Sequence, residues 1–139
     1  LKLGHKVVAC EQSKILYRLL NDAILRAKKE YDFFDNLSFI NSDSAVIIDS
    51  YLDSDIFYFD PMFEEVKQNT KRSGTLQKIG NVLSFEKLED TSAQIFDHML
   101  KKKYKKVIVK RSIKSNPLYE KINYQVKGKA IRYDVYVKT

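Results

Sequence analysis

The strongest chemical signal in the chain is the corner Asp60-Pro61-Met62-Phe63, which directly follows a strongly apolar run. An exocyclic amine on a nucleobase is a poor nucleophile, because its lone pair is delocalised into the ring. Hydrogen-bond acceptors that hold such an amine can direct the lone pair at an electrophilic methyl group. Asp60 and the backbone carbonyl of Pro61 could be those acceptors, and Phe63 offers a face on which a base stacks. The alternative is a turn that ends a strand, with Phe63 in the core, because Pro61 lacks an amide donor.

Two polar segments nearer the N-terminus could bind a nucleotide-like cofactor. Glu11 and Gln12 follow the first apolar run of the chain, and Asp43 and Ser44 follow the second. An acid directly after a buried strand can accept hydrogen bonds from both hydroxyls of a ribose. Asp43 and Ser44 could hold an adenine edge. Both pairs also have a local alternative, since acids and serines stabilise the beginning of a helix.

Basic side chains are concentrated in the second part of the chain. The protein has 25 Lys and Arg against 18 Asp and Glu, a net charge of +7. Residues 1–60 carry a net charge of −3 and residues 61–139 one of +10. Binding to nucleic-acid phosphates requires such a basic surface, although a solubilising lysine-rich surface has the same composition. Lys110 and Arg111 end an apolar run in this part, where a cation can contact an RNA phosphate or orient a base.

The elements that must position these residues follow from the apolar periodicity. Short β-branched runs predict strands, and apolar residues at three- and four-residue steps after Ser13 predict a helix that this serine caps. The expected strands are residues 6–10, 37–40, 55–59, 106–110, 123–127 and 131–137, and the expected helices are 14–29, 45–51 and 91–102, with a long loop over 64–81 that contains one helical turn. This alternation predicts a doubly wound, Rossmann-like α/β sheet, mostly parallel, with a C-terminal antiparallel hairpin. Ligands of such sheets bind beyond the carboxyl ends of the strands, where Glu11, Asp43 and Asp60 lie.

Composition excludes several classes of protein. At 139 residues and 44% hydrophobic content, the chain is long and apolar enough for one packed domain and unlike a disordered tail. A single cysteine, Cys10, excludes a disulfide framework and a multi-cysteine metal site, and His5 and His98 lack ligand-spaced partners. No apolar run approaches the roughly 20 residues that cross a bilayer. We therefore expect a soluble, metal-free domain from a reducing compartment such as the cytoplasm, without membrane contact. The sequence leaves the oligomeric state open, and we favour a monomer.

Taken together, the motifs resemble a known family, the RsmJ-type small-subunit ribosomal RNA guanine-N2 methyltransferases. These are class I enzymes that use S-adenosylmethionine (SAM). The resemblance runs along most of the chain in the family's order, through VACEQS at residues 8–13, FINSDS at 39–44, FYFDPMF at 57–63, VIVKR at 107–111 and KGKAIRYDVY at 127–136. The Asp-Pro-Met-aromatic motif and the strand ending in Lys-Arg are specific when they occur together at this separation.

The resemblance implies a reaction and a cofactor site. The methyl group of SAM is transferred directly to the N2 amine of a guanine in small-subunit (16S) ribosomal RNA, without a metal or a covalent enzyme intermediate. Glu11 and Gln12 are implied to bind the ribose region of SAM, and Asp43 and Ser44 the adenine end. Asp60 is implied to border both the cofactor and the target amine.

The resemblance also implies where RNA binds. The implied partner is small-subunit ribosomal RNA or the small ribosomal subunit itself. The residues implied to contact it are Lys110 and Arg111, together with Lys67, Lys71 and Arg72 in the basic segment after the Asp-Pro corner.

Two other functions stay open on the sequence. One is an amino-methyltransferase that acts on DNA or on another RNA, and the other is a nucleotide- or RNA-binding module without catalytic activity. The glycine-rich SAM loop of the family is not present upstream of Glu11. We therefore expect residues 1–139 to be the C-terminal portion of a single SAM-dependent methyltransferase domain, whose first strand and glycine-rich turn precede Leu1. Without that strand, its two neighbours in the sheet would expose unpaired backbone edges.

Overall fold

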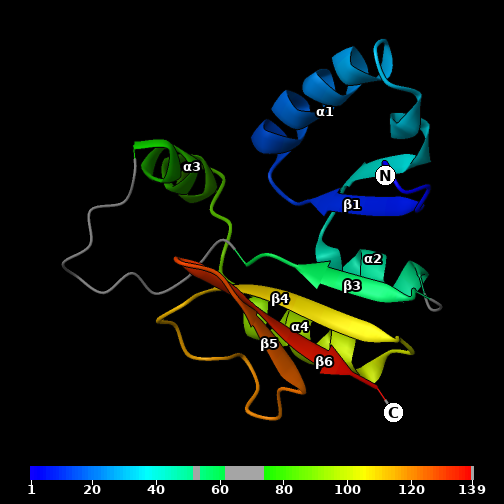
Figure 1. The fold of residues 1–139 in the computed structure, drawn as a ribbon. Helices are drawn as coiled ribbons and strands as arrows, with labels where there is room; N and C mark the ends of the chain where they lie inside the picture. Colours follow the sequence, from blue (N-terminus) through cyan, green and yellow to red (C-terminus); the bar gives the residue numbers. More distant parts are fainter. Residues whose placement is uncertain (52–53, 62–73, 139) are drawn as a thin grey trace. The chain divides into compact units, whose positions relative to one another are not determined.

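The computed structural model describes residues 1–51, 54–61 and 74–138, and the chain divides into two compact units (Figure 1). Unit 1 consists of Leu1–Ile47 and Arg72–Glu89, and unit 2 of Ile48–Lys71 and Asp90–Thr139. Within the described ranges, no helix is both long enough and apolar enough to cross a membrane.

Unit 1 is built on a pair of parallel strands and the helix that connects them. The strands are β1 (Val7–Glu11) and β2 (Leu37–Asn41), and between them lie α1 (Lys14–Lys28) and the short 3-10 helix η1 (Asp32–Asn36). The register places Glu11 opposite Asn41, so both strands end at the same level. α1 begins as the sequence predicts, because the hydroxyl of Ser13 accepts a hydrogen bond from a backbone N–H of its first turn at 3.0 Å. Tyr17 stacks on Phe39 with ring centroids 4.9 Å apart, which packs α1 against β2.

The helix α3 (Gly74–Phe85) of unit 1 corrects a prediction. The polar, glycine-containing composition of residues 64–81 predicts a long loop, and this prediction is wrong for residues 74–81, while 64–73 lie outside the described residues. Ile79, Val82 and Leu83 recur at three- and four-residue steps and form an apolar face, of which Leu83 is buried. Because two of these three residues lie beyond residue 81, the periodicity is not visible within the polar segment alone.

The residue after α3 ties this helix to the beginning of α1. The carboxylate of Glu86 accepts hydrogen bonds from the Ser13 hydroxyl and from the Ile15 N–H, the latter at 3.2 Å. Ser13 is fully buried, and its hydroxyl is satisfied both as a donor and as an acceptor. Lys87 then adopts a φ of 54°, in the left-handed region that commonly ends a helix. The beginning of α1, directly after Glu11, is therefore held by a contact distant in sequence.

Unit 2 contains a four-stranded mixed sheet with helices on one face (Figure 1). The strands are β3 (Ile56–Phe59), β4 (Lys106–Ser112), β5 (Tyr124–Lys127) and β6 (Ile131–Val137), in the order β3-β4-β6-β5. β3 and β4 are parallel, whereas β6 runs antiparallel to both of its neighbours. Phe96 and Met99 of α4 (Ser92–Lys101) share a buried core with Val107 and Val109 of β4. The end of α2 (Ser44–Ser50) adds Ile48 to this core.

The predicted fold class is confirmed. Two parallel pairs, β1–β2 and β3–β4, are each connected through helices, and the chain ends in the expected antiparallel hairpin of β5 and β6. The strands are distributed over two sheets, and within the described residues β1 and β3 each pair with one other strand.

A buried tyrosine makes the stability of unit 2 sensitive to alkaline pH. Burial raises the pKa of Tyr136 from 10.0 to about 12, and the charge of Asp134 adds to the increase. The unfolded chain loses the phenol proton near pH 10, and the folded chain loses it only near pH 12. The contribution of the neutral phenol to the stability of the fold is therefore complete below pH 10 and is lost as the pH rises from 10 to 12. We expect the free energy of unfolding to fall by roughly 2–3 kcal/mol over this interval.

The substitution Tyr136→Phe isolates this effect from the other groups that titrate at high pH. The Tyr136 phenol donates a hydrogen bond to the Tyr119 carbonyl at 3.0 Å, and phenylalanine cannot make this bond. At neutral pH the free energy of unfolding of the variant should therefore be about 1 kcal/mol lower than that of the parent. Urea denaturation of both proteins between pH 8 and pH 11.5 should show the stability difference falling to zero and then reversing as the pH rises, because the variant lacks the titrating phenol. A constant difference across this range would contradict the prediction.

Candidate functional site

Four of the five predicted cofactor-binding residues, Glu11, Gln12, Asp43 and Ser44, lie together at the carboxyl ends of β1 and β2 in unit 1, and the fifth, Asp60, belongs to unit 2. Because Glu11 pairs with Asn41, the residues that follow the two strands emerge side by side. The Gln12 side-chain amide donates a hydrogen bond to a carboxylate oxygen of Asp43 at 3.5 Å, and Ser44 follows Asp43 directly as the first residue of α2. The parallel register thus places two polar segments that are distant in sequence side by side, at the carboxyl ends of the two strands.

The two carboxylates of this edge are oriented by backbone N–H groups. One oxygen of Glu11 accepts from the Ser13 N–H, and one oxygen of Asp43 accepts from the Ala45 N–H, both at 2.8 Å. These are the contacts that acids make at the beginning of a helix, as the local alternative predicts. They also fix the direction of each carboxylate, and a fixed carboxylate is the acceptor that the hydroxyls of a ribose need.

Asn41 was not among the predicted site residues, and the structure gives it a definite role. Its side-chain amide donates to the carbonyl of Glu11 at 2.8 Å and to that of Gln12 at 3.2 Å. It therefore ties the turn after β1 to the end of β2. The available signal was its position, because Asn41 is the first polar residue after an apolar run.

Cys10 lies next to this edge and behaves as an inert thiol. Its Sγ donates to the carbonyl of Ser42 at 2.9 Å. Partial burial raises the pKa of the thiol, and the charges of Glu11 and Asp43 act in the same direction. The thiol is thus kept protonated at neutral pH, which agrees with a packing role and not a nucleophilic one.

In unit 2, the acid of the Asp-Pro corner is held by a lysine from the neighbouring strand. Phe59 pairs with Val109, so the next residues lie at the same level: Asp60 directly follows β3, and Lys110 lies two residues before the end of β4. The Lys110 ammonium donates to a carboxylate oxygen of Asp60 at 2.8 Å. Pro61 is buried and ends the strand. Predicted to contact RNA, Lys110 in the structure contacts the predicted catalytic acid.

Two tyrosines share the sheet face on which Lys110 lies. Tyr133 of β6 pairs with Lys110, and Tyr58 of β3 pairs with Ile108, two residues from Lys110 on the same face. The centroids of the two rings are 6.4 Å apart. Desolvation raises the pKa of the Tyr58 phenol, and the charge of Asp60 raises it further, so this hydroxyl is neutral at physiological pH.

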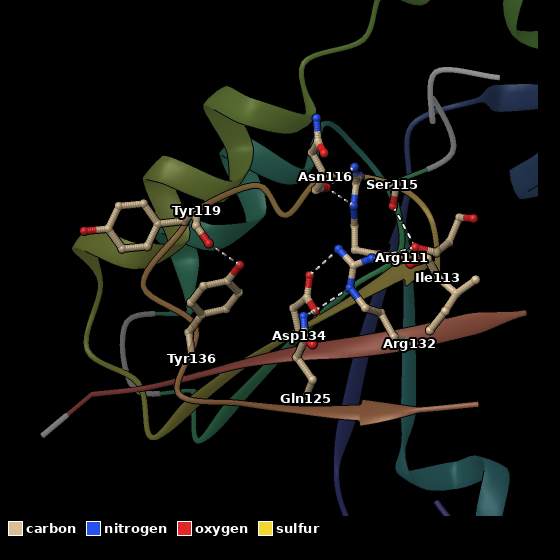
Figure 2. Close-up of polar contacts among 10 residues, drawn as sticks. Arg111, Ile113, Ser115, Asn116, Tyr119, Gln125, Arg132, Asp134 and Tyr136 are labelled. Atoms are coloured by element: carbon tan, nitrogen blue, oxygen red, sulfur yellow. Dashed lines mark hydrogen bonds and ion pairs between the residues drawn. The ribbon is translucent and has the colours of Figure 1, made fainter. Parts of the chain in front are cut away.

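Arg111 is bound to the segment that follows β4. Its guanidinium donates twice to the carbonyl of Asn116, at 2.8 Å and 3.2 Å (Figure 2). On the same sheet face, Arg132 of β6 donates to the carbonyls of Ser112 and Ile113 at 2.9 Å and 3.1 Å. The backbone after the Lys110-Arg111 pair is thus fixed by two guanidinium groups.

The remaining predicted site residues are not described by the structure. Phe63, predicted to stack on the base, and Lys67, Lys71 and Arg72, predicted to contact RNA, lie outside the described residues. The structure thus brings Glu11, Gln12, Asp43 and Ser44 together within unit 1, and Asp60 and Lys110 together within unit 2. The roles of these six residues stay predictions.

Three comparisons with known proteins place the chain. The family model for putative SAM-dependent methyltransferases matches residues 1–138. Curated relatives named ribosomal RNA small subunit methyltransferase J include one of Bdellovibrio bacteriovorus, 29% identical over 98% of this chain and 53% of the relative, and one of Francisella philomiragia, 32% identical over 96% of this chain and 57% of the relative. A solved SAM-dependent methyltransferase of Neisseria gonorrhoeae is 25% identical, with a TM-score of 0.69 over 98% of this chain and 57% of that one.

The comparisons agree with the motifs. The chain spans about half the length of the curated relatives that it matches. Their shared name confirms the resemblance to the RsmJ-type family, and the solved structure has the predicted fold. Since the family model covers residues 1–138 of 139, the chain belongs to the family of putative SAM-dependent methyltransferases.

Proposed function

We propose that the protein transfers the methyl group of SAM to the exocyclic N2 amine of a guanine in small-subunit ribosomal RNA. The observation that carries this proposal is the Asp60 carboxylate, held at 2.8 Å by Lys110 at the carboxyl end of β3. A hydrogen-bond acceptor that is held in a fixed direction at the carboxyl end of a parallel strand can hold an amine donor in place. The name shared by the curated relatives supports ribosomal RNA as the substrate.

The residues at the ends of β1 and β2 fit the nucleoside part of SAM. Ribose hydroxyls and the adenine amine are hydrogen-bond donors, and Glu11 and Asp43 are carboxylate acceptors whose direction is set by backbone N–H groups. Gln12 and Ser44 add neutral polar groups to the same edge. Bound SAM supplies an electrophilic methyl group on a positively charged sulfur.

In the proposed reaction, Asp60 accepts a hydrogen bond from the target amine and directs its lone pair at the methyl carbon. The backbone carbonyl of Pro61 is the second proposed acceptor, and Phe63 is proposed to stack on the base. The amine nitrogen would form the new N–C bond with its lone pair, while the C–S bond breaks with its electrons going to sulfur and S-adenosylhomocysteine leaves. The proton that the methylated amine gives up would pass to solvent. The proposed catalytic contribution is therefore positioning and electrostatics.

The basic second half of the chain supports RNA as the partner. Residues 61–139 carry a net charge of +10, and phosphate contacts dominate the affinity for nucleic acids. Arg111, Lys67, Lys71 and Arg72 are proposed to contact RNA phosphates. We further propose that both units belong to one methyltransferase domain, since a single solved chain matches 98% of this chain. We also propose that the protein is cytoplasmic, where ribosomal RNA is found, and monomeric.

The test uses the full-length protein with labelled SAM and small ribosomal subunits from a strain in which its gene is deleted. We expect SAM binding by calorimetry, methyl incorporation into the RNA, and N2-methylguanosine as the product in nucleoside mass spectrometry. RNA binding without incorporation would favour a non-catalytic module. Incorporation into DNA or another RNA, with none into the small subunit, would overturn the substrate assignment.

A further inference from the structure

The ion pair between Lys110 and Asp60 has a geometry that a phosphate-binding lysine would not need. The two residues lie at the same level on adjacent parallel strands, so the sheet register itself brings their side chains together. The ammonium nitrogen is 2.8 Å from the carboxylate oxygen. The side chains retain 34% and 44% of their exposure, so the pair is partly withdrawn from solvent.

The surroundings of the pair keep the lysine charged and in place. The hydrogen bond to Asp60 is the main cause that raises the pKa of Lys110 above its ordinary value of 10.5, and it outweighs the opposing effect of desolvation. Tyr133 lies opposite Lys110 on β6, and Tyr58 shares the same sheet face. At neutral pH the ammonium is therefore protonated and bound to the carboxylate.

A second lysine–aspartate pair joins the same two strands at their other end and provides a comparison. Lys105, just before β4, contacts Asp55, just before β3, at 2.7 Å, with side chains that are 78% and 71% exposed. Such exposed pairs contribute little, because water screens them. The chemistry of the two pairs is the same, but only the Lys110–Asp60 pair lies at the carboxyl edge and is partly shielded.

If Lys110 instead bound an RNA phosphate, its ammonium would have to leave Asp60 or be shared with it. The carboxylate would then lose its cation at the moment when it must hold the target amine. Retaining the pair has the opposite effect, because it keeps the cation beside the carboxylate and holds one of its oxygens in place. The ion pair therefore favours a role for Lys110 in holding the Asp60 carboxylate during methyl transfer.

We infer that Lys110 is a positioning residue, whose ammonium orients the Asp60 carboxylate toward the target amine, and not a contact to RNA phosphate. This inference rests on the proposed function and replaces the RNA contact that the family resemblance implies for Lys110. It assigns Lys110 to the transfer step and leaves RNA affinity to other basic residues.

The test compares Lys110→Met, Lys110→Arg and the control Lys105→Met in the full-length protein, by steady-state methyl transfer to small-subunit RNA at several salt concentrations. For Lys110→Met we expect kcat to fall by about 100-fold, with KM for RNA within about twofold of the parent. The salt dependence of RNA binding should be unchanged. Lys110→Arg should restore kcat to within about tenfold of the parent, since it keeps the charged donor. Lys105→Met should leave kcat and KM unchanged.

A double-mutant cycle shows whether Lys110 acts through Asp60. In an Asp60→Asn background, adding Lys110→Met should have little further effect on kcat. The inference is overturned if Lys110→Met leaves kcat intact, raises KM and reduces the slope of log affinity against log salt by about one phosphate contact. It is also overturned if the two substitutions lower kcat independently. Absence of methyl transfer by the parent protein would instead contradict the proposed function, so the two failures are distinguishable.

Discussion

Replacing Asp60 with alanine is expected to lower the rate constant of methyl transfer by about 1000-fold while leaving the fold cooperative, because it removes the acceptor that directs the amine lone pair. It also leaves Lys110 without the carboxylate that it contacts at 2.8 Å. Loss of that pair should cost the fold at most about 1 kcal/mol, since both side chains are partly exposed. Single-turnover incorporation of labelled methyl groups into small-subunit RNA measures the rate constant without interference from product release.

Asp55→Ala is the matched control for this experiment. It removes an aspartate that pairs with a lysine of the same neighbouring strand, at the other end of β3. We expect normal transfer and a cooperative unfolding transition for the control, and a cooperative transition without appreciable transfer for Asp60→Ala. Normal turnover by the Asp60 variant would show that the mechanistic assignment is wrong.

The second large effect is expected at the buried ion pair of β6, which has no direct part in the proposed chemistry (Figure 2). Asp134 is fully buried and accepts hydrogen bonds from Arg132 at 2.8 Å and 3.2 Å and from the Gln125 amide at 2.7 Å. Removing the carboxylate in Asp134→Ala leaves the guanidinium as an uncompensated buried charge. We expect the free energy of unfolding to fall by about 3–5 kcal/mol, measured by urea denaturation of the full-length protein.

A double variant separates the cost of an unpaired charge from the value of the pair. Arg132→Met with Asp134→Leu removes both charges and keeps apolar volume, and such replacements are often neutral or stabilising. Here we expect the double variant to stay less stable than the parent, because it also loses the hydrogen bonds from Arg132 to the carbonyls of Ser112 and Ile113. A loss below about 1 kcal/mol in Asp134→Ala would show that the site relaxes or admits water, contrary to the burial of this pair.

Much of the secondary structure was predictable, because its signals are local. The spacing of apolar residues after Ser13 predicts α1, and this serine caps it as expected. The alternating pattern around Tyr133 predicts β6, and Gly128 lies in the turn of the hairpin. α3 was missed because its apolar residues are few and lie partly beyond the polar segment that conceals them.

The candidate site was predictable as a set of positions but not as a set of contacts. The rule that ligands bind at the carboxyl ends of strands selects Glu11, Asp43 and Asp60 from the sequence. The structure adds the roles of Asn41, which ties β1 to β2, and of Glu86, which holds the beginning of α1. Asn41 is marked in the sequence only by its position after an apolar run, and Glu86 is not marked at all, because each acts on backbone that is distant along the chain.

The sequence by itself determines which residues could do chemistry, where most strands and helices lie, and which family the motifs resemble. Only the tertiary structure decides that Lys110 contacts Asp60 and that Arg132 and Asp134 form a buried pair. The physical reason is that periodicity reports only which face of an element is apolar. Strand register and burial set which charged groups meet and how strongly water screens them, and both arise only when strands distant in sequence come together.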